Sequence, residues 1–212
     1  EITNPPITTT SINFTHWFFL EKEDWLSSIF NLFLTISLVT TIYAKDADSF
    51  DVYEWMSTLK GEWKLSPADE QLDTYSYTHP AVFPIVGTNT TGMAFKSIGY
   101  DSTIQEDLLP NTTKQMVTMY HCKDMECEQL KATHYCVKQN QPEFIANFKE
   151  STKNKIVFDC DMTTELCQSD EDHVHKIIHE ISNDGKHLKS SYLSWKNKKQ
   201  KKNSSIYHFD KK

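Results

Sequence analysis

The chain contains no arginine: all 22 of its basic residues are lysine, against 29 acidic residues, and the formal net charge is −7. Without guanidinium groups the protein lacks bidentate phosphate recognition, and the acidic balance argues against a nucleic-acid partner. Glycine is also scarce, with five residues in 212. No glycine-rich phosphate loop and no nucleophile elbow occurs, so the common nucleotide-binding and hydrolase motifs are absent.

Long apolar runs are missing except at residues 29–44, IFNLFLTISLVTTIYA. This run is short for a membrane span and ends in a small residue, which predicts a signal peptide cleaved after Ala44. The preceding residues 21–24 are net acidic where a basic region is expected, so an uncleaved membrane anchor is the alternative. We therefore expect an N-terminal extension over residues 1–44, a domain over residues 45–212, and export to the periplasm or the medium.

The five cysteines agree with an exported protein. Cys122 and Cys127 bracket one short loop, Cys160 and Cys167 bracket another, and Cys136 is left over. Cross-strand positions beside a hairpin loop approach closely enough to bridge, so the spacing predicts two local disulfides and one free thiol. The spacings match no zinc template, and no metal cluster is expected.

The remainder of the chain predicts an all-β domain. Residues 50–59 have apolar side chains at helical spacing and predict one short helix before the domain. Gly61 and Trp63 begin the first strand, and residues 66–87 form an irregular loop. Short alternating segments then follow, at 92–100, 102–109, 114–122, 128–137, 142–149, 155–161, 173–182, 186–197 and 203–210. Evenly spaced strands of this kind predict an up-and-down antiparallel barrel or a sandwich. About ten strands opened by a helix and a Gly-x-Trp favour the barrel.

Polar side chains interrupt the apolar faces of several strands. His134 and Cys136 share a face with Leu130 and Ala132, and strict alternation carries that face into the core. Glu106 lies between Ile104 and Leu108 on another apolar face. Tyr120 shares a face with Met116 and Thr118, but alternation does not decide whether this face is inside.

Three further histidines occur in one strand. His173, His175 and His179 alternate with charged residues, which sends them inward or to the rim; in the next strand Trp195 shares a face with Leu193. The pair at 173 and 175 with His134 would make a metal site, and Glu106 with His134 would make an acid and base pair. A satisfied structural histidine and a ligand cavity are the other hypotheses.

Several of these motifs together resemble a family of uncharacterised bacterial lipocalin-like (calycin-type) β-barrel domains. The similar elements are Met-Val-Thr-Met-Tyr-His at 116–121, Thr-His-Tyr-Cys at 133–136, Asn-Gln-Pro at 140–142, the His-x-His strand at 173–175 and the Trp of Leu-Ser-Trp at 195. The resemblance covers roughly residues 59–209. It implies a calycin-like barrel and, by analogy of fold, a small apolar ligand.

The sequence thus predicts an exported lipocalin-like protein that binds a small hydrophobic molecule in the barrel without catalysis. The ligand-binding residues are expected to be Glu106, Tyr120, His134, Cys136, Asn140, Gln141, His173, His175 and Trp195. The alternatives are an enzyme that uses Glu106 and His134, or a haem-binding or metal-binding barrel. For haem, the distant comparison is with nitrobindin-like barrels, with His208 as the ligand, although their glycine-rich N-terminal motif is missing here. No particular cofactor is indicated.

Overall fold

The structure is a computed structural model, and it describes residues 48–67 and 74–212. The predicted signal peptide and its cleavage point lie outside the described residues. Within them, no helix has both the length and the apolar character needed to cross a membrane.

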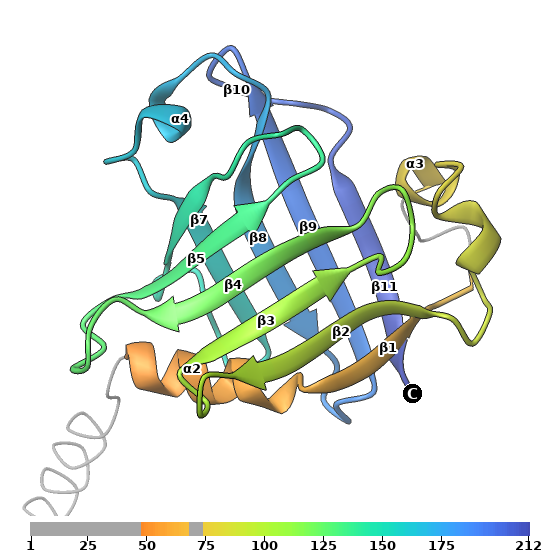
Figure 1. Cartoon of the computed structure of the whole chain (residues 1–212), viewed down its shortest axis with the longest axis horizontal. Coiled ribbons are helices and arrows are strands. Elements are labelled where there is room, and N and C mark those ends of the chain that lie inside the picture. Colours follow the sequence, from red (N-terminus) through yellow and green to blue (C-terminus); the bar gives the residue numbers. More distant parts are fainter. Residues whose placement is uncertain (1–47, 68–73) are drawn as a thin grey trace, which may run out of the picture. The chain divides into compact units, whose positions relative to one another are not determined.

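Ten antiparallel strands close into a barrel, each paired with its neighbours along the chain (Figure 1). They are β1 (Gly61–Leu65), β2 (Thr91–Ile98), β3 (Thr103–Leu108), β4 (Met116–Cys122), β5 (Leu130–Tyr135), β6 (Glu143–Ala146), β7 (Lys155–Cys160), β8 (His173–Ile181), β9 (His187–Lys196) and β11 (Ser205–Lys211). Pairing of β11 with β1 completes the ring, while β10 (Lys199–Gln200) pairs with the end of β9. The predicted all-β, up-and-down barrel is confirmed.

The predicted helix before the barrel is α2 (Ser49–Thr58). Its first turn is stabilised by a capping box in which Asp48 and Asp51 each accept a hydrogen bond from the other's backbone N–H, at 3.0 and 3.1 Å. At its other end the carbonyl of Leu59 accepts a hydrogen bond from the fully buried indole of Trp63, at 2.9 Å. The indole therefore joins the end of the helix to the first strand.

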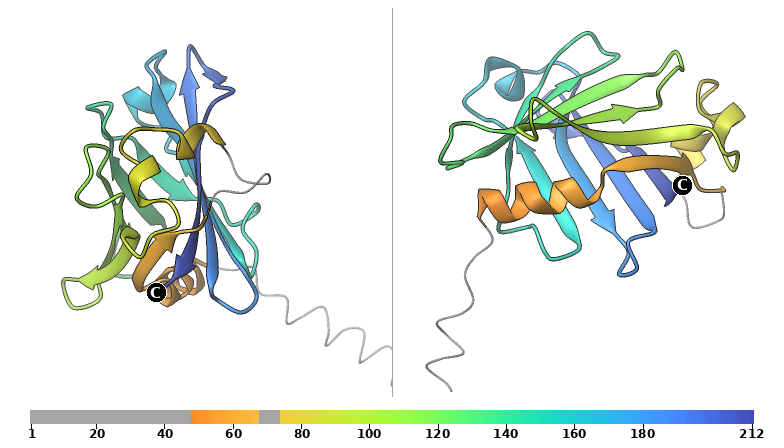
Figure 2. Two further views of the ribbon diagram at one scale, coloured as in Figure 1. Left: turned by 90° about the vertical axis from the view of Figure 1, so that its right-hand side faces the viewer. Right: turned by 60° about the horizontal axis from the view of Figure 1, so that its bottom comes forward.

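One end of the barrel is covered by α2, which lies across it (Figure 2). The Trp55 indole donates to the Lys153 carbonyl at 2.8 Å, and the Tyr53 hydroxyl donates to the Asp101 carbonyl. These two carbonyls belong to the β6–β7 and β2–β3 connections. The helix is thereby fastened to loops from two sides of the barrel and closes this end.

Short helices occur in the connections. Two of them, α3 (Thr74–Tyr77) and the 3₁₀ helix η1 (Phe83–Ile85), lie in the segment predicted as an irregular loop, and α4 (Glu165–Gln168) follows β7. The Tyr77 hydroxyl accepts from the backbone N–H of His208 at 2.9 Å and lies 3.1 Å from its carbonyl, so α3 is fixed against β11.

Cross-strand register sets the interior. One row of facing residues runs through four strands, from Phe95 in β2 to Glu106, Thr118 and His134 in β3 to β5. A second row crosses the other wall from Ile156 in β7 through His179 and Ser190 to Tyr207 in β11. All these side chains are buried. Because facing residues in a sheet share one side, the two rows bring polar groups from both walls into the core.

Both predicted disulfides are present. Cys122 is bridged to Cys127 across the β4–β5 loop, with their Cα atoms 4.8 Å apart. Cys160 at the end of β7 is bridged to Cys167 in α4, with a Cα separation of 5.7 Å. Cys136 is free and partly buried, as the spacing predicted.

The three histidines of β8 do not share one face as the sequence predicted, because the strand contains a β-bulge. Pairing with β9 shifts register between Val174 and Lys176, so His175 is the extra residue. A bulge reverses the alternation on its two sides. His179 therefore points inward, opposite Ser190, whereas His173 pairs with Trp195 on the other face of the sheet.

Candidate functional site

Glu106 is the centre of a buried hydrogen-bond network inside the barrel, and its side chain is fully enclosed. One carboxylate oxygen, Oε1, accepts from the Tyr192 hydroxyl at 2.5 Å and from the Thr118 hydroxyl at 3.2 Å. The other, Oε2, accepts from the Tyr120 hydroxyl at 2.6 Å and lies 3.2 Å from His179 Nε2. Groups from β4, β8 and β9 thus converge on one carboxylate of β3.

This environment keeps Glu106 ionised. Burial opposes the charge, but hydrogen bonds from His179, Tyr120 and Tyr192 and the nearby His179 ring outweigh it, so the pKa of Glu106 lies below its usual value. Burial and the carboxylate's negative charge raise the pKa of both tyrosines well above normal. The tyrosines therefore stay protonated and act as donors to the carboxylate.

His179 extends the network to the opposite wall. Because the Tyr120 proton goes to Glu106, the phenol oxygen accepts from His179 Nε2–H at 2.9 Å, and this one N–H is shared with Glu106 Oε2 at 3.2 Å. His179 Nδ1 lies 2.8 Å from the Ser190 hydroxyl, which supplies the remaining hydrogen bond. The polar side-chain atoms of Glu106, Tyr120, His179 and Ser190 thus have partners among the described residues and form a buried network.

His134 differs, because one of its ring nitrogens has no partner. The Thr118 hydroxyl has one proton, which it must donate to the acceptor-only carboxylate of Glu106. In the 2.9 Å hydrogen bond between them, His134 Nδ1–H is then the donor and the Thr118 oxygen is the acceptor. The other ring nitrogen, Nε2, therefore carries a lone pair. Nε2 is buried and has no hydrogen-bond partner among the described residues.

The charge state of His134 agrees with this arrangement. Burial lowers its pKa to about 4, with the Glu106 charge opposing and Lys138 adding to the effect. The ring is therefore neutral near pH 7, with one N–H and one free lone pair. His134 Nε2 is therefore a hydrogen-bond acceptor for which residues 48–67 and 74–212 provide no donor.

A cavity of about 180 Å³ reaches His134 from the barrel surface. Its apolar lining includes Met116, Val137 and Val174, together with the ring of Tyr192. Tyr75 of α3 and His79 just after it also line the cavity, as does Lys114 in the β3–β4 connection. The other lining residues come from the β5–β6 and β10–β11 connections and from strand ends. The hydrogen bonds of α2 go to the β2–β3 and β6–β7 connections, and neither connection lines this cavity.

Three lysines surround this opening. Lys138 and Lys201 both pair with the single carboxylate of Asp172, the second at 2.6 Å, so this trio retains one positive charge. Lys138 also donates to the Ser194 hydroxyl at 3.0 Å. Lys114 donates to the Tyr207 hydroxyl at 3.0 Å. The opening is therefore polar and cationic above an apolar floor.

The structure separates the nine expected site residues into two groups. Glu106 and Tyr120 lie in the buried hydrogen-bond network, and His134 and Cys136 line the 180 Å³ cavity. Asn140 donates to the Asp172 carbonyl at 3.1 Å near its rim. Gln141 is exposed, and no hydrogen bond of its side chain is recorded among the described residues.

The second group lies elsewhere. His173, His175 and Trp195 line a separate cavity of about 380 Å³ beside α4. The bulge in β8 turns His173 and His175 away from the interior, and Trp195 faces outward because it alternates with the inward Ser194 of β9. The hypothesis of a metal site formed by this pair with His134 is therefore not supported by the geometry.

Sequence reasoning missed part of the interior. It left the face of Thr118 undecided and overlooked Ser190, Tyr192 and Ser194, which alternate along β9 and all point inward. That alternation of small polar and aromatic residues is a usable signal for an inner face. It was obscured because the apolar Leu193 and Trp195 occupy the outer face.

The haem hypothesis depended on His208. Its neighbours Tyr207 and Phe209 are fully buried core residues, so alternation places His208 on the outer face of β11. There His208 Nδ1 lies 3.0 Å from His187 Nε2. His208 therefore does not face the barrel interior.

Comparison with known proteins adds no assignment: no family model, curated protein or solved structure matches this chain.

Proposed function

We propose that this chain is an exported barrel protein that binds one small, mainly apolar molecule at the open end, without catalysis. The observation that carries the proposal concerns His134, which lines the cavity: its Nε2 is a buried acceptor with no hydrogen-bond partner among the described residues. A buried polar atom left unpaired costs about 1–3 kcal/mol. A ligand with an O–H or N–H group would remove this cost.

The cavity volume suggests the size of the ligand. An engineered apolar cavity of about 150 Å³ binds benzene. A volume of about 180 Å³ therefore suits a single ring or a short branched chain with a small polar substituent. The substituent would donate to His134 Nε2, and the apolar part would contact Met116, Val174 and the Tyr192 ring.

Catalysis by Glu106 and His134 is the second candidate, because Thr118 connects them through hydrogen bonds at 3.2 and 2.9 Å. Two features favour binding over catalysis. First, Glu106 is enclosed, and both of its carboxylate oxygens already accept hydrogen bonds. Second, a pKa of about 4 makes His134 a weak base near neutral pH.

Export and family membership belong to the same proposal. Two disulfides suit an oxidising compartment, which supports export. The closed ten-strand barrel supports the proposed likeness to lipocalin-like domains, in which function resides in the cavity rather than in the fold itself.

Matched small ligands test the proposal. Benzyl alcohol and benzyl methyl ether have the same ring, but the alcohol alone carries a donor. We expect calorimetry or chemical-shift titration to show the alcohol binding about 5–150-fold more tightly, the equivalent of leaving one buried group unpaired. Equal binding of both compounds, or no shift at residues that line the cavity, would contradict the proposal.

A variant locates the interaction. His134→Asn keeps an amide N–H where Nδ1 donates to Thr118 but has no atom at the Nε2 position. It should remain folded and lose the preference for the alcohol. His187→Asn, at a half-exposed histidine on the outer face of β9, is the matched control and should bind as the unaltered protein does. A preference that survives in His134→Asn would refute the role of Nε2.

A further inference from the structure

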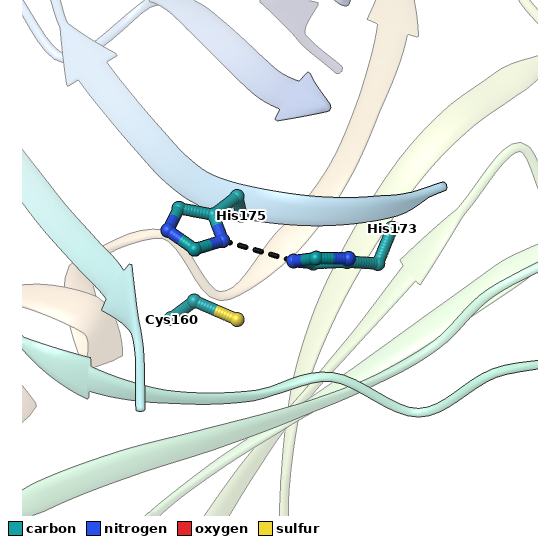
Figure 3. Close-up of side chains that lie close together, drawn as sticks. All are labelled: Cys160, His173 and His175. Carbon is teal, nitrogen blue, oxygen red and sulfur yellow. Dashed lines mark hydrogen bonds between the residues drawn. The ribbon is translucent and has the colours of Figure 1, made fainter. Parts of the chain in front are cut away.

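A second group of side chains lies outside the ligand cavity, beside α4. Cys160, His173 and His175 each offer one donor atom, and these three atoms lie within 4.8 Å of one another. Figure 3 shows the Cys160 sulfur next to both imidazole rings. In the oxidised protein Cys160 is bridged to Cys167, so a fourth donor is covalently attached to the first.

We propose that reduction of the Cys160–Cys167 disulfide creates a tetrahedral Zn²⁺ site from these two cysteines, His173 and His175. Two thiolates and two imidazoles are a common donor set for zinc. The site is independent of the ligand proposed above. It was not evident from the sequence because the spacing of the four residues follows no zinc motif.

The distances suit such a site. Zinc bonds of about 2.0 Å to nitrogen and about 2.3 Å to sulfur place two ligand nitrogens about 3.3 Å apart, and nitrogen and sulfur about 3.6 Å apart. His173 Nε2 and His175 Nδ1 are 2.9 Å apart. Because the three donor atoms lie within 4.8 Å of one another, the Cys160 sulfur must approach each nitrogen by at most about 1.2 Å to reach the tetrahedral spacing.

His173 is already oriented as zinc ligands are. Its Nδ1 lies 2.8 Å from the Glu171 carbonyl, and a carbonyl only accepts, so the ring donates there. The other nitrogen, Nε2, therefore presents its lone pair toward His175. A backbone carbonyl that holds the far N–H of a ligating histidine fixes the ring tautomer and its orientation. The bulge at His175 supplies the second ring on the same side.

The neighbouring cavity supplies room for the sulfur atoms to separate. In a disulfide they are about 2.05 Å apart, and as zinc ligands about 3.8 Å apart. Cys167, His173 and His175 all line the 380 Å³ cavity. Because Cys167 is carried by the four-residue α4, its sulfur can move without disturbing a barrel strand.

The redox step is a thiol–disulfide exchange. A dithiol reductant transfers two electrons and two protons to the disulfide, is itself oxidised to a disulfide, and leaves two protein thiols. Zinc then displaces the two thiol protons to solvent. Disulfide and metal site exclude each other, so the same residues tether α4 to β7 in both redox states.

The test uses the barrel with Cys122→Ser, Cys127→Ser and Cys136→Ser, so that only the proposed pair of cysteines remains. The protein is reduced with a phosphine, which becomes a phosphine oxide by taking oxygen from water, and is titrated with Co²⁺ as a spectroscopic substitute for Zn²⁺. We expect one Co²⁺ per chain, with tetrahedral visible bands and a thiolate charge-transfer band, after reduction only. Identical spectra before and after reduction, or no thiolate band, would overturn the proposal.

Two further variants in this background assign the ligands. His175→Ala should weaken binding by about 10-fold or more, and His187→Ala, in the half-exposed His187–His208 pair, should leave it unchanged. His175→Ala retains the disulfide, so its fold is checked by near-ultraviolet circular dichroism before reduction. If reduction unfolds the protein, Zn²⁺ should restore the folded spectrum; failure to do so, or equal binding by His175→Ala, would also overturn the proposal.

Discussion

Acid should destabilise this protein in a pH range set by His134. The folded-state pKa is about 4, against about 6.5 for an ordinary histidine. Between these values the unfolded chain binds a proton at this position and the folded protein does not. The free energy of unfolding therefore rises with pH in this range. The stabilising contribution of a neutral His134 is fully present above about pH 6.5 and is lost as the pH falls toward 4.

The magnitude follows from the same shift. Between about pH 8 and pH 4.5, proton binding to the unfolded chain at this one position removes about 2–3 kcal/mol of stability. Glu106 adds a separate contribution of known sign. Its pKa is lowered by folding, so its stabilisation is lost only as the pH falls below about 4.5. The range from pH 6.5 to 4.5 thus isolates the histidines.

Urea unfolding of the oxidised protein at a series of pH values measures this effect, with His134→Asn as the comparison. The pKa values of His79 and His175 are also lowered, chiefly by burial, but both residues are present in both proteins and their contributions cancel. We expect the unaltered protein to lose about 2–3 kcal/mol more than the variant between pH 8 and pH 4.5. Parallel curves for the two proteins would refute the assignment of a buried, neutral His134.

The remaining predictions concern the core and the cysteines. Tyr192→Phe removes a donor 2.5 Å from the buried carboxylate and should lower the unfolding free energy by about 1.5–3 kcal/mol, whereas Tyr135→Phe at an exposed position should change it little. Equal effects of the two changes would contradict a carboxylate-centred core. Cys122→Ser with Cys127→Ser opens a six-residue loop and should cost about 2 kcal/mol in thermal or urea unfolding. Peptide mapping without reductant should recover Cys136 as a free thiol, and its appearance in a bridge would overturn the pairing.

Much of the fold could be predicted from local pattern. Alternation placed Glu106 and His134 on inward faces, helical spacing located α2, and loop-bracketing cysteines predicted both disulfides. These inferences succeed because strand faces, helix faces and hairpin loops depend on residues a few positions apart. The barrel followed from regular strand spacing.

Two features depended on contacts between distant strands. Inserting one residue at His175 reverses the direction of side chains along β8, and local alternation contains no sign of such a bulge. That reversal separates His179 from His173 and moves the latter beside Cys160. Closure of the barrel likewise brings Tyr192 of β9 within 2.5 Å of Glu106 of β3.

The sequence by itself determined the strands, the inward position of His134 and the cysteine pairs, because each is a property of a short segment. Only the tertiary structure decided which atoms of His134 are paired. Thr118, which itself donates to Glu106, accepts from Nδ1 through cross-strand register, and no described residue forms a hydrogen bond with Nε2. The hydrogen-bonding state of one buried nitrogen depends on every strand around it, and so does the cavity into which it opens.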